Sequence, residues 1–139
     1  MYSIKEVSQM LHLPASTIRY YDKEGLLPFV KRTEAGYRVF DDGDITMLKI
    51  IECLKLTDMP IKDIRQFTKW VQMGDASLQE RRDMFSARRE AVLQQMEKLQ
   101  QTLKVIEYKY WYYQTALEAG TEEVHKTGQV HRDKPSCLK

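Results

Sequence analysis

Apolar residues first recur at the spacing of one face of a helix at Ile4, Val7 and Leu11. Ser3 precedes this stripe and Glu6 follows Ser3 by three residues, a capping-box pattern in which the two side chains satisfy each other's backbone N–H groups. A second helix is predicted over residues 14–24, because proline is tolerated at a helix start and Gly25 can adopt the conformation that ends one. Residues 3–24 therefore predict a helix-turn-helix.

The pattern changes from helical spacing to alternation over residues 29–40. Apolar and polar residues alternate on either side of Glu34–Gly36, which indicates two strands joined by a turn. Gly36 supplies the backbone angle that such a turn requires. A hairpin directly after a helix-turn-helix is typical of a winged helix-turn-helix.

Two more helices are predicted over residues 45–56 and 61–73. The first is apolar over most of its circumference, so we expect it to be central. The second carries an apolar stripe and places Lys62 on its outer face. Asp58 and Pro60 lie between them, where Asp58 tolerates unusual backbone angles and Pro60 can begin a helix.

The longest apolar stripe follows Gly74–Asp75, in a stretch without Gly or Pro from Ser77 to Gly120. A helix of this length spans about 60 Å. Its apolar positions repeat in steps of four and three, at Val92, Met96, Leu99, Leu103, Ile106, Tyr110, Tyr113 and Leu117. The preceding 73 residues are too few to cover this stripe, so we expect two copies to pair as a coiled coil.

These elements predict a mainly α protein with three parts. Residues 1–73 form the winged helix-turn-helix and residues 74–117 the dimerisation helix. Residues 118–139 lack periodicity and are expected to form a flexible tail.

One face of the predicted helix at 14–24 carries Ser16, Arg19, Tyr20 and Lys23, a set that cannot build an apolar core. Such a face suits a groove of DNA, where arginine reads base edges or phosphates and hydroxyl groups bind phosphate oxygens. The hairpin adds basic residues against a single acid, Glu34. The predicted DNA contacts are Ser16, Thr17, Arg19, Tyr20, Tyr21, Lys31, Arg32, Tyr37, Arg38 and Lys62.

Composition limits the remaining possibilities. The net charge is only +2, so any nucleic-acid contact must use locally concentrated basic groups. No apolar run approaches the ~18 residues of a membrane span, no signal peptide is present, and two distant cysteines make no disulfide framework. We therefore expect a cytoplasmic protein. Phosphate-binding glycine loops, Ser/His/Asp sets and catalytic metal-binding pairs are absent, so we expect no enzyme.

The strings TIRYYDKEGLL, GYRVF and DITMLKII, in this order, resemble the N-terminal domain of MerR-type bacterial transcription regulators. The resemblance extends to about residue 113. It implies a homodimer with an antiparallel dimer helix, bound to a palindromic operator inside a promoter. It also implies that DNA bending and untwisting realign the promoter elements for RNA polymerase. Family members that bind metals usually carry cysteines around the dimer helix, and none stand there here, so no cofactor or metal is expected.

Cys53 is the candidate sensing residue. At helical spacing it shares a face with Lys49, whose ammonium would stabilise a thiolate. A packed, inert cysteine is the simpler interpretation from chemistry alone. The sequence ECLK, however, resembles the MerR branch that senses aldehydes and other thiol-reactive electrophiles, which favours a sensor of aldehyde, electrophile or oxidative stress. An adduct on Cys53 would then displace packed neighbours and tilt the recognition helices.

Three alternatives remain open. An aromatic cluster between Tyr108 and Tyr113 would line a pocket for a small hydrophobic ligand, although Tyr110 and Tyr113 also belong to the dimer stripe. A constitutive DNA-binding repressor would need no signal. Metal binding in the tail has weak support, because no fixed geometry holds its candidate ligands His125, His131 and Cys137.

Overall fold

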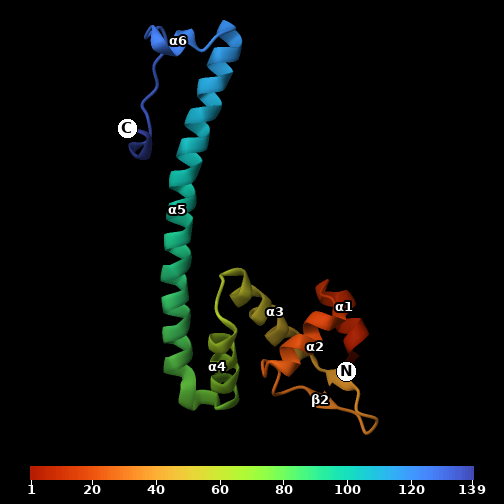
Figure 1. Ribbon diagram of the computed structural model, residues 1–139. Coiled ribbons are helices and arrows are strands. Elements are labelled where there is room, and N and C mark those ends of the chain that lie inside the picture. The colour runs from red at the N-terminus through yellow and green to blue at the C-terminus, as the bar shows by residue number, and fades with distance from the viewer. The chain divides into compact units, whose positions relative to one another are not determined.

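Helices form most of the chain in the computed structural model, which describes residues 1–139 (Figure 1). The chain divides into two compact units, Met1–Arg88 and Arg89–Lys139. None of the helices is both long enough and apolar enough to cross a membrane.

The first unit begins with the predicted helix-turn-helix, made of α1 (Ile4–Leu11) and α2 (Ala15–Lys23). The predicted capping box is confirmed. The Ser3 hydroxyl accepts from the Glu6 backbone N–H at 3.2 Å, and the Glu6 carboxylate accepts from the Ser3 N–H at 3.3 Å. These two bonds satisfy donors at the start of α1 that no helical carbonyl reaches.

The predicted hairpin is also confirmed, with strand β2 (Lys31–Arg32) antiparallel to β3 (Arg38–Phe40). Gly36 has a φ of 89° in the turn, a left-handed angle that favours glycine. The sequence did not indicate β1 (Tyr2–Ser3), which pairs with the other edge of β3 and gives the order β1-β3-β2. Two residues are too few to show an alternating pattern.

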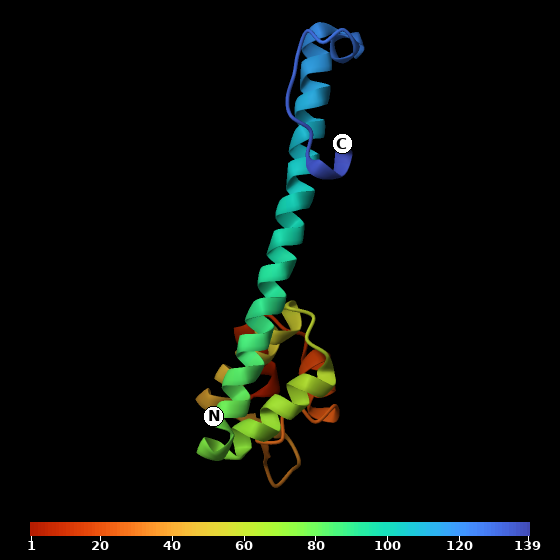
Figure 2. The ribbon, with the colours of Figure 1, turned by 90° about the vertical axis from the view of Figure 1, so that its left-hand side faces the viewer.

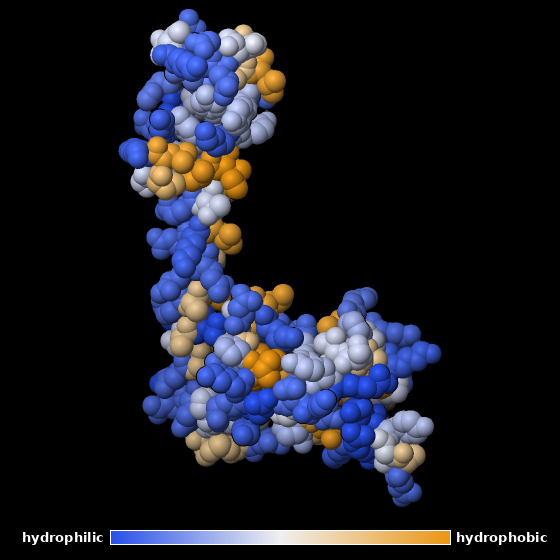
Figure 3. Space-filling model, in the orientation of Figure 1, coloured by the Kyte–Doolittle hydropathy of each residue, from blue (hydrophilic) through white to orange (hydrophobic).

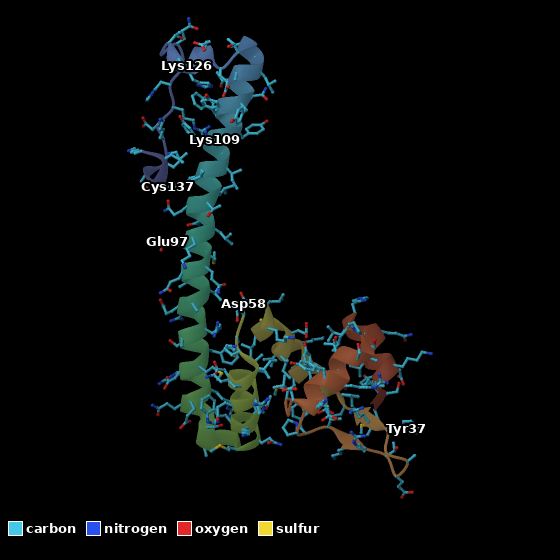
Figure 4. The ribbon with its side chains drawn as sticks, viewed as in Figure 1. Tyr37, Asp58, Glu97, Lys109, Lys126 and Cys137 are labelled. Carbon is cyan, nitrogen blue, oxygen red and sulfur yellow. The ribbon has the colours of Figure 1, made fainter.

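The next two helices are α3 (Asp42–Leu56) and α4 (Ile61–Gln72). α3 begins three residues before the predicted start at residue 45, because Asp41 caps it and accepts from the Asp44 N–H at 2.8 Å. In the turn between the helices, labelled in Figure 4, Asp58 has a φ of 62°. Aspartate tolerates this left-handed angle better than most residues.

The core of the first unit gathers side chains from all of these elements. It comprises Val7, Ile18, Tyr21, Leu26, Leu27, Phe40, Ile45, Leu48, Ile51, Leu54, Met59, Ile64 and Phe67. Because Ile18 is fully buried on the inner side of α2, its opposite side remains free for function.

A short 3-10 helix, η1 (Gly74–Ser77), leads into the 42-residue helix α5 (Leu78–Ala119). The first turns of α5 belong to the first unit. The Phe85 ring meets the Phe67 ring edge to face at 5.4 Å, and the Arg88 guanidinium donates to the Thr57 carbonyl at 3.0 Å. The first unit therefore continues past the expected boundary at residue 73, because these turns cover α4.

The second unit contains the rest of α5 and the residues that follow it. The long helix ends at Ala119, before Gly120 with a φ of 75°. The following segment forms α6 (Glu123–Lys126) and the short 3-10 helix η2 (Ser136–Leu138), and it returns alongside α5 in both views (Figures 1 and 2). It differs from the flexible tail that we expected, because Val124 is buried. The four residues of α6 are too few to show a helical period in the sequence, so the sequence does not predict this packing.

Candidate nucleic-acid interface

The outward face of α2 carries exposed polar groups without partners in the chain. Ser16, Arg19 and Tyr20 are exposed, and Thr17 is half-buried beside them. Arg19 forms no ion pair, and Tyr20 leaves 45% of its surface exposed although it is aromatic. A guanidinium and a phenol held on a rigid helix with free donors suit phosphates and base edges.

The wing is fastened to α2 through Asp22, which the sequence reasoning did not single out. The Arg38 Nε donates to the Asp22 carboxylate at 2.7 Å, and Arg32 Nη2 reaches the same oxygen at 3.4 Å. Arg32 also donates to the Gly36 carbonyl at 2.8 Å, within its own hairpin. Two of the predicted DNA-binding arginines thus orient the wing. The sequence does offer a signal for this role, because Asp22 is an acid on a recognition helix whose other charged residues are basic.

Lys31 and Tyr37 complete the exposed surface of the wing. Lys31 makes no ion pair, and the Tyr37 ring is 74% exposed beyond the hairpin turn (Figure 4). The Tyr37 hydroxyl forms no hydrogen bond within the unit, so it is available to a partner.

A second contact fixes α4 to the end of α2. Arg65 Nε donates to the Glu24 carbonyl at 2.6 Å, and Arg65 Nη2 lies 3.4 Å from the Glu24 carboxylate. Lys62 is exposed one turn earlier on α4 and forms no ion pair. Of the basic residues on α4, Arg65 therefore serves the fold, while Lys62 is free to meet a phosphate.

The structure corrects our assignment of Tyr21 to the DNA contacts. Its side chain is only 1% exposed, and its hydroxyl donates to the Glu52 carboxylate of α3. Burial, with the Glu52 hydrogen bond added, raises the pKa of the phenol above its ordinary value. The Lys55 ammonium lies 4.9 Å from the centre of its ring. Tyr21 thus links the recognition helix to α3 and does not reach DNA.

Cys53 is exposed on α3, and Lys49 is exposed one turn before it. The sulfur is therefore accessible to reagents from solvent. This exposure corrects the expectation that an adduct would push against packed neighbours in its own unit. The two neighbours of Cys53 do contact the interior of the unit. Leu54 belongs to the core, and Glu52 accepts a hydrogen bond from Tyr21.

The predicted dimer stripe is largely uncovered. Val92 is half-buried, whereas large apolar side chains on the same stripe leave half or more of their surface exposed, namely Met96, Leu99, Leu103, Ile106, Tyr110, Tyr113 and Leu117. Figure 3 shows hydrophobic patches along this helix. The surface of a monomer rarely presents such a row of apolar groups without a partner.

The aromatic cluster divides between two faces of α5. Tyr110 and Tyr113 lie on the exposed stripe, 71% and 54% exposed. Tyr108 is buried, and with Trp111 it faces the returning segment. The three candidate metal ligands of the tail do not come together: His125 stacks on Tyr112, His131 pairs with Asp133, and Cys137 is exposed. No group of three or more metal-binding side chains occurs in the chain.

Two family models match this chain. Residues 2–69 match the MerR HTH family regulatory protein, and residues 45–107 match the model described as MerR, DNA binding. The two matches together cover the helix-turn-helix, the wing, α3, α4 and more than half of α5.

Relatives match over about two thirds of the chain or more. An uncharacterized HTH-type transcriptional regulator of Haemophilus influenzae is 36% identical over 93% of this chain and 96% of its own length. The crystal structure of HiNmlR, a MerR family regulator lacking the sensor domain, bound to promoter DNA, is 37% identical with a TM-score of 0.79. The match covers 88% of this chain and 98% of that one. The regulator AdhR of Bacillus subtilis is 29% identical over 66% of each chain.

Proposed function

This chain belongs to the MerR family of DNA-binding transcriptional regulators, and from that premise we propose that it binds a palindromic promoter operator as a homodimer and activates transcription by distorting the DNA. The observation that carries the proposal is the exposed, unpaired set Arg19, Tyr20, Lys31 and Tyr37 on α2 and the wing. The similar HiNmlR structure is bound to promoter DNA, which supports the same use of this surface.

The contacts have different roles. Arg19 enters the major groove and meets base edges or phosphates, while Tyr20, Tyr37 and Lys31 bind the backbone. Arg32 and Arg38 hold the wing against α2 through Asp22, so they fix the distance between helix and wing. Lys62 adds a phosphate contact from α4.

Binding to a labelled fragment of the protein's own upstream promoter tests these roles. Arg19→Ala should cost a few kcal/mol in specific binding, about the value of one bidentate base contact. Lys31→Ala should weaken binding to specific and unrelated DNA alike and lower the salt slope by about 1. Lys98→Ala, an exposed change on α5, serves as the control. Wild-type affinity in Arg19→Ala would remove α2 from the interface.

The dimer is supported by the uncovered apolar stripe of α5. Two recognition helices would lie on one face of the duplex, with half-sites separated by multiples of about 34–36 Å. Bending and untwisting the spacer between promoter elements costs several kcal/mol, which contacts along both half-sites must offset. The distorted promoter then presents its two elements to RNA polymerase, which this regulator affects only through DNA.

We further propose that Cys53 receives the inducing signal from an aldehyde, another electrophile or an oxidant. Its exposure supports access by reagents from solvent, and Lys49 is exposed one turn before it on the same helix. With an aldehyde, the thiolate adds to the carbonyl carbon and the oxygen takes up a proton, giving a hemithioacetal. The signal passes through α3, since Glu52 joins this helix to Tyr21 of α2.

Transcription from that promoter, measured with and without formaldehyde, tests the sensor. Cys53→Ser should bind the operator normally but lose induction, while Cys137→Ser, the matched exposed cysteine, should induce as wild type. Hydrogen peroxide provides the oxidant arm. Full induction in Cys53→Ser would reject the thiol mechanism, and an uninduced wild type that only represses would favour the constitutive repressor.

A further inference from the structure

A half-open cavity of about 480 Å³ lies between the end of α5 and the segment that returns alongside it. This volume is in the range of small-molecule sites, roughly 300–1,000 Å³. α5 contributes Tyr108, Trp111 and Tyr112, and the returning segment contributes His125 and Val130. Figure 4 labels Lys126 of α6, which lines the cavity.

The aromatic wall of this cavity is held in place by ring contacts. The His125 ring stacks on Tyr112 with 3.8 Å between centroids and 11° between planes, and it meets the Trp111 ring at 5.2 Å. Trp111 lies 5.5 Å from Tyr108 in turn. His125 Nε2 donates to the Tyr112 carbonyl at 2.8 Å, since a carbonyl can only accept. Four rings thus pack together to form this wall.

The rim of the cavity carries more basic than acidic side chains. Lys126, Arg132 and Lys134 line it together with one acid, Asp133. Lys126 pairs with Glu123 at 3.1 Å, and Asp133 lies 3.1 Å from His131 Nε2, while Arg132 and Lys134 form no ion pair. An aromatic wall excludes water from one side of a ligand, and free cations at the rim then attract an anion more strongly than in open solvent.

We propose that this cavity binds a small planar carboxylate of the aromatic-acid class. The ring of the ligand lies against Tyr108 and Trp111, and its carboxylate meets Arg132 and Lys134 at the rim. A guanidinium binds a carboxylate with two parallel hydrogen bonds, which gives the site its preference for a flat anion over a neutral molecule. The site requires neither DNA nor Cys53, and Tyr110 and Tyr113 of the dimer stripe lie outside it.

Occupancy has a structural consequence within the second unit. The ligand contacts both α5 and the returning segment, so binding stabilises the docked position of residues 124–134. The free energy of that stabilisation equals the ligand's preference for the docked state. Bound ligand should therefore protect the returning segment from protease.

Tryptophan fluorescence of the full chain tests the site directly. Trp111 is in the wall and the other tryptophan is Trp70 of α4, so a Trp70→Phe background isolates the signal. Benzoate is the probe, and benzamide is its neutral counterpart of nearly equal shape. Benzoate should change Trp111 emission saturably, with benzamide at least about tenfold weaker, the usual scale of a charge-assisted hydrogen bond. Equal affinity for the two probes, or a change that never saturates, would overturn the proposal.

Two pairs of variants assign the affinity to the cavity. Arg132→Gln with Lys134→Gln should weaken benzoate about tenfold or more, whereas Lys5→Gln with Lys98→Gln makes the same change in net charge elsewhere and should leave it unaltered. Val130→Asp should abolish binding by placing a like charge in the cavity, while Val130→Thr should retain it. Helicity and sedimentation of each variant verify folding. Equal losses in the two lysine-containing pairs, or undiminished binding in Val130→Asp, would reject the site.

Discussion

The two units of this protein treat their large apolar side chains in opposite ways. In the first unit, side chains such as Ile18, Leu48 and Ile64 are completely buried in one core. In the second, Leu99 and Leu103 of α5 are 69% and 51% exposed. The first unit buries its large apolar side chains within one chain. The long stripe of the second unit can be buried only against another surface. The contrast distinguishes a unit with a closed core from a unit with an uncovered apolar stripe.

The largest effect is expected from charge placed on the stripe of α5. Leu99→Asp with Leu103→Asp should give a monomer whose first unit remains folded, because neither residue belongs to its core. Operator affinity should fall by about 10²–10⁴, the range lost when two linked contacts become independent. Sedimentation and gel-shift titration measure both effects.

The control for this change uses the polar side of the same helix. Gln94→Asp with Gln101→Asp adds the same charge at exposed positions off the stripe and should leave dimer and affinity intact. A dimer that survived the leucine changes would show that another surface holds the two copies together.

Truncating one leucine in each unit tests the core and the stripe separately. Leu48→Ala should lower the free energy of unfolding of the first unit by about 2–5 kcal/mol, because it leaves a cavity in a closed core. Leu103→Ala should leave that free energy unchanged and shift only the concentration at which dimers form. Urea unfolding followed by Trp70 fluorescence in a Trp111→Phe background distinguishes the two variants. Equal losses in the free energy of unfolding would mean that the two units unfold together as one cooperative fold.

A smaller effect is expected where the wing joins α2. Arg38 donates to Asp22 with only 19% of its side chain exposed, whereas Arg32 is 53% exposed on the same carboxylate. Arg38→Gln should lower stability by about 1 kcal/mol, since it removes a partly buried charged hydrogen bond. Arg32→Gln should cost a few tenths, as exposed pairs do. Thermal unfolding of both variants measures the two losses of stability. A larger loss in Arg32→Gln than in Arg38→Gln would mean that Arg32 holds the wing.

An effect of similar size to that of Arg38→Gln is expected at the link between α2 and α3. Burial and the Glu52 hydrogen bond raise the folded pKa of Tyr21 above the unfolded value of 10.0. A raised folded pKa means that this stabilisation is complete below pH 10 and is lost as pH rises further. Tyr21→Phe should cost about 1 kcal/mol at neutral pH and reduce the loss of stability above pH 10. Urea unfolding across pH 8–11 measures it, and an unchanged alkaline profile would contradict the assignment.

The sequence determined much of this protein through local rules. The capping residue Ser3, the turn at Gly36 and the end of α5 before Gly120 depend on backbone angles and nearby hydrogen bonds, so a short stretch of sequence contains the signal. The stripe on α5 depends only on helical period, and its exposure agrees with the predicted role. Arg19 and Tyr20 were assigned to the outer face of α2 for the same reason, and both are exposed.

Only the tertiary structure decided which side chains in a sequence motif meet distant partners. Tyr20 and Tyr21 are adjacent tyrosines, yet one faces solvent and the other donates to Glu52, 31 residues away. Arg38 meets Asp22 across 16 residues, and Val124 becomes buried in a segment with no pattern of its own. Periodicity reports the direction of a side chain from its own helix or strand. It carries no information about the partner that packing brings opposite that side chain.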